Sequence, residues 1–229
     1  MRNNILVFLL LIVFTCSCAT AQADTARLLV MGDSLTGGLY ASDDAHMFAR
    51  LLADDFGAEL ATCRGTYVHN LLDCELDGFD YIVIEIGLND VSNWNNGSLP
   101  ENEWIETYEE LVQNAQMAGA TVIVATMFHA VPTALPTYEK YERYNGHIQE
   151  IAATTGATFA DVWGATKNCQ GCISQHWQPS AFPPGYAGDN FHPNDVGHAL
   201  IAQTIYKATQ TRHLFFPVVP GGAPGYPVD

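Results

Sequence analysis

Basic residues are scarce in this chain. Nine Lys and Arg side chains stand against 25 Asp and Glu side chains in 229 residues, and the formal net charge is −16. The acidic residues are spread along the chain instead of forming a tail, so a surface of this composition repels phosphate backbones and anionic membranes. The composition argues against a nucleic-acid partner and favours neutral or small substrates, although the same charge can simply keep a protein dissolved in salty surroundings.

Long apolar runs are scarce as well. The longest covers the ten residues Ile5–Phe14, which is too short to span a bilayer. Arg2 precedes this run, and small residues dominate up to Ala21-Gln22-Ala23, which fits the cleavage rule of a secretory signal. We therefore expect residues 1–23 to be a signal peptide cleaved near Ala23, and the protein to be secreted or periplasmic. No second run of this kind follows, so we expect no membrane span in the mature chain.

Cysteine is the third scarce residue, with six in the chain. Lipid attachment at Cys16 or Cys18 is an alternative to simple cleavage, although Thr15-Cys16-Ser17 is a poor version of that signal. Four cysteines remain beyond this segment, and an even number of cysteines in an oxidising compartment predicts two disulfides. Among the three connectivities, proximity favours Cys63 with Cys74 and Cys169 with Cys172. The Cys169–Cys172 pair could instead be a redox or metal pair, but no second CxxC or CxxH follows at metal-site spacing, and we expect no metal.

Apolar runs of strand length alternate with amphipathic runs of helix length. The expected strands cover 28–31, 58–62, 81–86, 121–126 and 157–160, and the expected helices lie near 48–56, 98–118, 138–155 and 196–208. Five strands alternating with helices indicate an α/β fold with one doubly wound parallel sheet. We expect a single domain over residues 24–216, followed by a flexible Pro/Gly-rich tail over 217–229.

Two segments give more local expectations. Ser98 followed three residues later by Glu101 is a capping-box pattern, with Pro100 in the first turn of the helix. Residues 162–190 are rich in Gly, Pro and aromatic residues and are expected to be irregular. Loops of this length are usually functional or disordered.

The stretch that organises the chain is the strand Leu28–Met31 with the turn that follows it. The turn reads Gly32-Asp33-Ser34, and Gly37-Gly38 come shortly after, so the backbone can bend where a buried strand emerges. Binding sites in open α/β sheets lie outside the carboxyl ends of the strands. The alternative is an ordinary turn with Asp and Ser as turn formers.

The other predicted strand ends supply the partners that a serine nucleophile needs. Gly65 follows the second strand, Asn89 follows the third, and Asp189 and His192 precede the last helix. A nucleophilic serine requires a base, a carboxylate that orients the base, and donors for the oxyanion. We assign these roles to His192, to Asp189, and to the backbone N–H groups of Ser34 and Gly65 with the Asn89 amide. Each residue alone is an ordinary turn or cap residue, and it is the joint occurrence that favours a site.

Four blocks, in chain order, resemble the SGNH hydrolase family, also called the GDSL esterase/lipase family. They are Gly32-Asp33-Ser34-Leu35, Gly65, Gly87-Leu88-Asn89-Asp90 and Asp189-Asn190-Phe191-His192-Pro193. The resemblance implies a three-layer α/β/α, flavodoxin-like fold with a five-stranded parallel sheet in order 2-1-3-4-5. It also implies ester hydrolysis through an acyl-enzyme with no cofactor. One departure is Arg64, where the family commonly has a small polar residue, and Arg64 could narrow the acyl pocket or contact a polar substrate.

The leading hypothesis is a secreted, monomeric serine esterase that removes a short acyl group from a carbohydrate or similar neutral substrate. His129, Trp94 and Trp177 are further candidate substrate contacts, or else loop anchors. A lipid-directed esterase or lysophospholipase is a second reading. A catalytically silent carbohydrate-binding protein on the same scaffold is a third.

Overall fold

The computed structural model describes residues 25–92, 97–129, 135–173, 189 and 191–215. Five parallel strands form one sheet in the order β2-β1-β3-β4-β5. The strands are β1 (Ala26–Gly32), β2 (Ala58–Arg64), β3 (Tyr81–Glu85), β4 (Thr121–Ala125) and β5 (Thr158–Ala160). The predicted order 2-1-3-4-5 is therefore confirmed.

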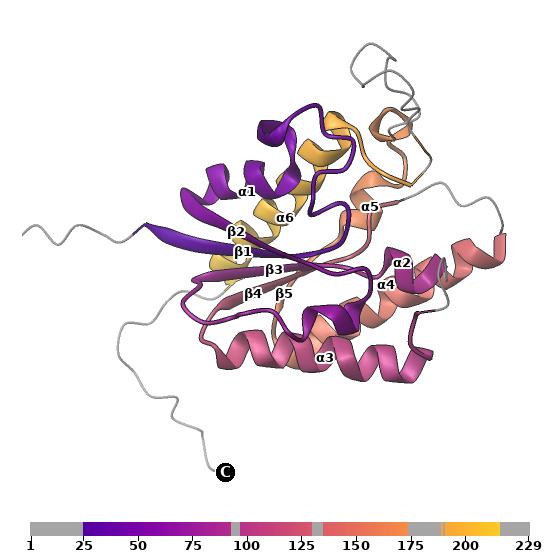
Figure 1. Cartoon of the computed structure of the whole chain (residues 1–229), viewed down its shortest axis with the longest axis horizontal. Coiled ribbons are helices and arrows are strands. Elements are labelled where there is room, and N and C mark those ends of the chain that lie inside the picture. The colour runs from indigo at the N-terminus through magenta and orange to yellow at the C-terminus, as the bar shows by residue number, and fades with distance from the viewer. Residues whose placement is uncertain (1–24, 93–96, 130–134, 174–188, 190, 216–229) are drawn as a thin grey trace, which may run out of the picture.

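Helices cover both faces of the sheet (Figure 1). The helices α1 (Phe48–Phe56) and α6 (Asp195–Phe215) pack together on one face, and α3 (Glu101–Met117) and α4 (Leu135–Thr155) pack together on the other. Shorter elements are α2 (Leu88–Ser92), α5 (Val162–Thr166) and the 3-10 turns η1 (Asp44–His46), η2 (Val68–Leu71) and η3 (Gln170–Cys172). This arrangement confirms the predicted three-layer α/β/α fold.

The sequence pattern of each strand follows from its place in the sheet. In β1 and β3 the apolar residues Leu28–Met31 and Ile82–Ile84 are almost completely buried, because helices cover both faces of these central strands. The edge strand β2 has no buried residue by contrast. Removing one such apolar side chain from water stabilises the fold by about 1.5–3 kcal/mol, so the central strands anchor the sheet.

Two local predictions differ from the structure. Helix α3 begins at Glu101 and its N-cap residue is Pro100, whereas the sequence pattern places the N-cap at Ser98 and Pro100 inside the first turn. The Glu101 carboxylate instead accepts hydrogen bonds from Arg143 Nε at 2.8 Å and is 2.8 Å from Nε2 of His147, which ties α3 to α4. The expected irregular segment from residue 162 onward begins with the helix α5, in which Asp161 caps the N-terminus by accepting from the N–H of Gly164.

Both predicted disulfides are present, Cys63–Cys74 and Cys169–Cys172. In the part of the chain that the structure describes, no helix has the length and apolarity needed to cross a membrane. The expected signal peptide, the Cys18 alternative, Trp94, Trp177 and the tail over 217–229 lie outside the described residues.

His198 is completely buried where α6 meets α1 and the loop before it. Its Nδ1 accepts from the N–H of Phe48 at 3.4 Å, and its Nε2 is 3.3 Å from the carbonyl oxygen of Leu39. Burial lowers the pKa of His198 to about 4. The histidine is therefore neutral in the folded protein at neutral pH, with a structural role in joining α6 to the opposite end of the chain.

We expect His198 to make the fold acid-sensitive between about pH 6.5, its ordinary pKa, and pH 4. In that window the unfolded chain binds a proton that the folded chain does not, so stability falls as pH falls. The shift corresponds to about 3 kcal/mol. Chemical denaturation of His198→Gln should give a flatter pH dependence of the unfolding free energy than wild type. The exposed His46 provides the control, since His46→Gln should keep the acid sensitivity. Equal acid sensitivity in wild type and His198→Gln would contradict the assignment.

Candidate active site

The structure brings the predicted serine, histidine and aspartate together at the carboxyl edge of the sheet. Ser34 follows β1, whereas Asp189 and His192 precede α6. The Oγ atom of Ser34 is 2.8 Å from Nε2 of His192, and Nδ1 of His192 is 2.7 Å from Oδ2 of Asp189. Three groups separated by up to 158 positions in the chain thus form one continuous hydrogen-bonded line.

Asp189 holds this line in a defined orientation. Its Oδ1 accepts from the backbone N–H groups of Phe191 and His192, both at 2.9 Å, in the tight turn expected from the three-residue spacing. Partial burial by itself raises the pKa of Asp189, but the hydrogen bonds from His192 and Phe191 outweigh it and lower the pKa to about 2. An ionised carboxylate only accepts, so Nδ1 of His192 carries a proton and Nε2 is available to accept from Ser34.

The disulfide in the CxxC segment supports the turn that carries His192. Asn194 donates from its backbone N–H to the carbonyl of Cys172 at 2.9 Å and from Nδ2 to the carbonyl of Gly171 at 2.7 Å. Gly197 leaves no room for a side chain, because a Cβ there would collide with the Cys172 carbonyl. The disulfide-bonded segment thus supports the start of α6.

Among the described residues, no cluster of His, Cys, Asp and Glu could hold a metal ion.

The predicted oxyanion donors are only partly available in this conformation. The backbone N–H of Gly65 donates to the carbonyl of Gly32 at 2.9 Å, so this group is already engaged. The side-chain Nδ2 of Asn89 donates one hydrogen to Oδ2 of Asp33 at 3.0 Å. That bond fixes the orientation of the Asn89 amide and leaves the second hydrogen of Nδ2 to donate to another acceptor. The N–H of Gly65 would serve an oxyanion by leaving the Gly32 carbonyl or by being shared with it, and its role as a donor stays a prediction.

Asp33, which the sequence pattern places in the turn before Ser34, contacts one of the predicted oxyanion donors. It is buried, and its carboxylate accepts from the N–H of Leu35 at 3.0 Å as well as from Asn89. Burial raises the pKa of Asp33 to about 6, against the opposing effects of the Leu35 hydrogen bond and the nearby His192. At neutral pH Asp33 is therefore an ionised group that orients Asn89.

Two further buried acids surround Asp33. Burial, followed by the neighbouring charge of Asp33, raises the pKa of Glu85 well above its usual range, and Oε2 of Glu85 has no partner among the described residues. Burial raises the pKa of Asp90 to about 7, although Asp90 accepts from the N–H of Val68. Because like charges this deep repel one another, burial and the charge of Asp33 both favour the protonated form of Glu85. An acid inside the otherwise apolar run 81–86 is the sequence signal that could have revealed it.

The remaining predicted contacts lie in different places. Arg64 is exposed and packs on Gly37, where a Cβ would collide with the guanidinium, so it borders the loop that follows Ser34. His129 packs against Trp163 and Tyr138, with ring centroids 4.4 and 5.7 Å away, and is not among the residues that line the cavity beside His192. His129 thus belongs to an aromatic cluster between α4 and α5.

Tyr40 was not singled out from the sequence, yet it lies against the histidine. Its ring centroid is 5.6 Å from that of His192. Among the described residues it is the one non-glycine residue with a positive φ, at 66°. Such backbone strain tends to occur where a site needs a defined geometry, and here it places an aromatic ring beside the imidazole.

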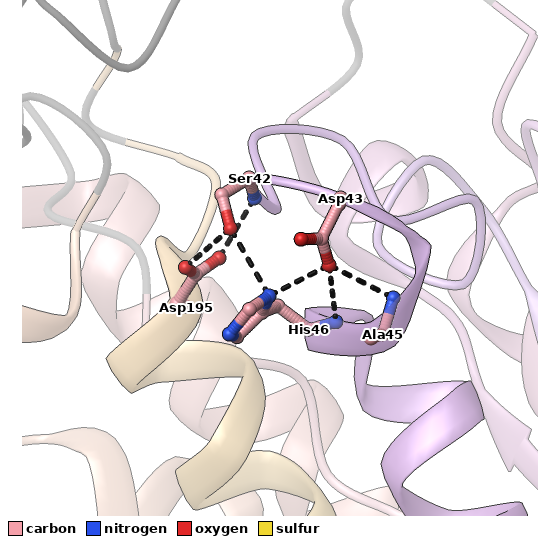
Figure 2. A network of polar contacts seen from close by, with 5 residues as sticks. All are labelled: Ser42, Asp43, Ala45, His46 and Asp195. Atoms are coloured by element: carbon pink, nitrogen blue, oxygen red, sulfur yellow. Dashed lines mark hydrogen bonds and ion pairs between the residues drawn. The ribbon is translucent and has the colours of Figure 1, made fainter.

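Figure 2 shows a second group of Ser, His and Asp side chains at the surface. Oγ of Ser42 is 2.7 Å from Oδ2 of Asp195 and 3.1 Å from Nδ1 of His46, and the same Nδ1 is 2.7 Å from Oδ1 of Asp43. A relay requires one imidazole nitrogen for the serine and the other for the carboxylate, which this arrangement does not provide. The hydrogen bond to Asp43, followed by the charge of Asp195, raises the pKa of His46. The group links η1 to the start of α6.

The chain belongs to the GDSL-like Lipase/Acylhydrolase family, which matches residues 30–200. This confirms the resemblance read from the sequence. A search of curated proteins found no match to this chain.

Solved structures share the fold. One is LAE5, an alpha/beta hydrolase enzyme from the metagenome of Lake Arreo, Spain, with a TM-score of 0.61 and 22% identity over 81% of this chain and 95% of that one. A catalytic mutant of Axe2, an acetylxylan esterase from Geobacillus stearothermophilus, has a TM-score of 0.63 and 20% identity over 80% of this chain and 93% of that one. The acetyl xylan esterase AlAXEase has a TM-score of 0.61 and 19% identity over 80% of this chain and 98% of that one. At these identities the likeness establishes the fold.

We expect Asp33→Asn to lower kcat for an aryl ester by about tenfold, which is about 1.4 kcal/mol, with a smaller effect on KM. A carboxamide offers one acceptor where two N–H donors meet Asp33, so the Asn89 amide must turn. Steady-state kinetics provide the measurement. Glu85→Gln is the matched control, because burial and the charge of Asp33 favour the neutral form of Glu85, so an uncharged isostere should be tolerated there. Full activity in Asp33→Asn, or an equal loss in both variants, would contradict the positioning role.

Proposed function

We propose that this protein is a serine esterase in which Ser34 attacks the ester carbonyl. The observation that carries the proposal is the line from Asp189 through His192 to Ser34, with distances of 2.7 and 2.8 Å. His192 takes the proton from Ser34 Oγ as the acyl bond forms, and then gives it to the departing alkoxide. Water, deprotonated by the same nitrogen, releases the acid and restores the serine.

We further propose that the free hydrogen of the Asn89 amide and the backbone N–H of Ser34 stabilise the oxyanion. Each donor of this kind typically contributes about 3 kcal/mol to the transition state. Gly65 would join them if a small shift at the end of β2 released its N–H from Gly32. The nearby Cys63–Cys74 disulfide restrains that strand end, so the movement would be local.

The substrate is proposed to be a short acyl ester of a neutral carbohydrate. The cavity beside His192 has a volume of about 140 Å³ and is bordered by Leu88, Asn89, Ser92 and Phe191, which favours a small acyl group. The net charge of −16 disfavours anionic lipid surfaces. Two structures with the same fold are acetylxylan esterases. We also propose secretion of a monomeric hydrolase domain over 24–216 after cleavage near Ala23, which the two disulfides support.

Ser34→Ala should lower kcat by at least about 10³-fold, because it removes the hydroxyl that lies 2.8 Å from Nε2 of His192. The assay measures acid release from an aryl acetate and from acetylated xylo-oligosaccharides. Ser42→Ala is the matched control, since Ser42 also contacts a histidine but in the surface group of Figure 2. Ser42→Ala should keep its activity. Unchanged hydrolysis by Ser34→Ala would falsify the role of Ser34, whereas a wild type that hydrolyses neither ester would favour a binding protein.

Acyl length gives an independent test of the substrate. We expect kcat/KM to be at least about tenfold higher for an aryl acetate than for the octanoate, because methylenes that find no room cost about 1–3 kcal/mol. Leu88 is nearly buried and lines the cavity, so Leu88→Ala should narrow the difference between the two esters. A preference for the long chain in wild type would instead support the lipid-directed reading.

A further inference from the structure

A second and larger cavity lies between α4, the ends of β4 and β5, and α5. Its volume is about 390 Å³, and it shares no lining residue with the cavity beside His192. Asn145, Gly146 and Gln149 border it from α4, and Thr126 and Asp161 from the two strand ends. Cavities of this size are ordinary for small-molecule ligands. Nothing in the proposed esterase mechanism uses these residues.

Gly146 is a costly residue at its position. It lies in the interior of α4 (Leu135–Thr155), where glycine destabilises a helix by about 1 kcal/mol relative to alanine. A Cβ at Gly146 would meet no atom within 4 Å, so packing among the described residues does not require the missing side chain. Glycine is useful where a ligand approaches the backbone closely. The open space above Gly146 fits such an approach.

Asn145 gives an independent indication of a ligand. Its side chain is only 7% exposed, and Oδ1 accepts from the N–H of Met127 at 2.9 Å. Its Nδ2 is buried with no hydrogen-bond partner among the described residues. A buried donor left without an acceptor costs about 1–3 kcal/mol. Since Asn145 borders the cavity, an acceptor on a bound molecule could satisfy this group after a small turn of the amide.

The lining indicates the class of ligand. The one cation that borders the cavity, Lys167, is paired with Glu142 at 3.1 Å, so a phosphate or another anion would find no uncommitted positive charge among the described residues. The rings of Phe159 and Trp163 also border the cavity, beside the amides, the hydroxyl of Thr126 and the carboxylate of Asp161. Aromatic rings beside amides, a hydroxyl and a carboxylate suit a sugar, which has apolar C–H faces and hydroxyl edges.

We propose that this cavity binds a glycosyl unit of a neutral carbohydrate, at a site separate from the acyl pocket. Its use as an anchor for a polymeric substrate rests on the proposed esterase function, whereas the binding itself does not. A polysaccharide held at two places dissociates more slowly than one held at the reacting ester alone. The site therefore bears on polymeric substrates and leaves small esters unaffected.

The test titrates unacetylated xylotetraose and cellotetraose into Ser34→Ala, into the double variant with Gly146→Phe and into the one with Gly146→Ala, by calorimetry and NMR. The Phe side chain should fill the cavity and weaken binding by at least about tenfold, whereas the single Cβ that Ala adds takes up little of the open space and should weaken binding less. The single variant Gly146→Phe, in which Ser34 is intact, should hydrolyse acetylated xylan more slowly than the wild type but hydrolyse an aryl acetate at the same rate.

Gln149→Ala, at an exposed position on the cavity border, is a second variant in case Gly146→Phe does not fold, and it should also weaken binding. The proposal is overturned if neither saccharide binds, if binding is insensitive to these substitutions, or if inorganic phosphate binds there instead. The outcomes separate the two proposals. Aryl acetate hydrolysis without saccharide binding rejects only the cavity site, and Gly146-sensitive binding by a protein that hydrolyses no ester rejects only the esterase.

Discussion

The contact between Ser34 Oγ and His192 Nε2 is the interaction on which the rest of the site depends. It joins residues 158 positions apart at 2.8 Å, and such a contact is entropically expensive unless a rigid frame holds both ends. The parallel sheet supplies one end, because β1 delivers Ser34 to its carboxyl edge. The other end is supplied by α6, which His198 joins to Phe48 and Leu39 and which the Cys169–Cys172 segment buttresses through Asn194.

Three buried acids near Ser34 determine where negative charge lies beside the site. Asp33, Glu85 and Asp90 are all nearly inaccessible to solvent, and burial raises the pKa of each. Asp33 accepts from the N–H of Leu35 and from the Asn89 amide, and these hydrogen bonds stabilise its negative charge. The Asp33 carboxylate thus orients the Asn89 amide, while burial and the charge of Asp33 favour the protonated form of Glu85.

The two cavities divide the carboxyl edge of the sheet between them. The smaller lies at His192 and Asn89, and the larger follows β4 and β5 and is bordered by α4 and α5. His129, expected from the sequence to contact substrate, packs on Trp163, a residue that borders the larger cavity. Its position suggests a supporting contribution to that cavity, through the aromatic cluster, rather than a contact with the reacting ester.

The sequence by itself determined the central strands, the disulfides and the main site residues, because these features depend on local patterns and residue types. The apolar runs at Leu28–Met31 and Ile82–Ile84 indicated central strands, and the resemblance to the family implied the sheet order. The proximity of the cysteines favoured their pairing, and the common edge of parallel strands predicted that Ser34 meets His192. The start of α3 was misjudged, because the carboxylate of Glu101 is used by Arg143 and His147 on another helix. Only the tertiary structure decided that Asp33 holds Asn89, that Gly65 is engaged by Gly32, and that Gly146 faces an empty space. Each of these depends on which groups from distant segments lie within hydrogen-bonding or van der Waals distance, and such distances are set by packing and not by spacing along the chain.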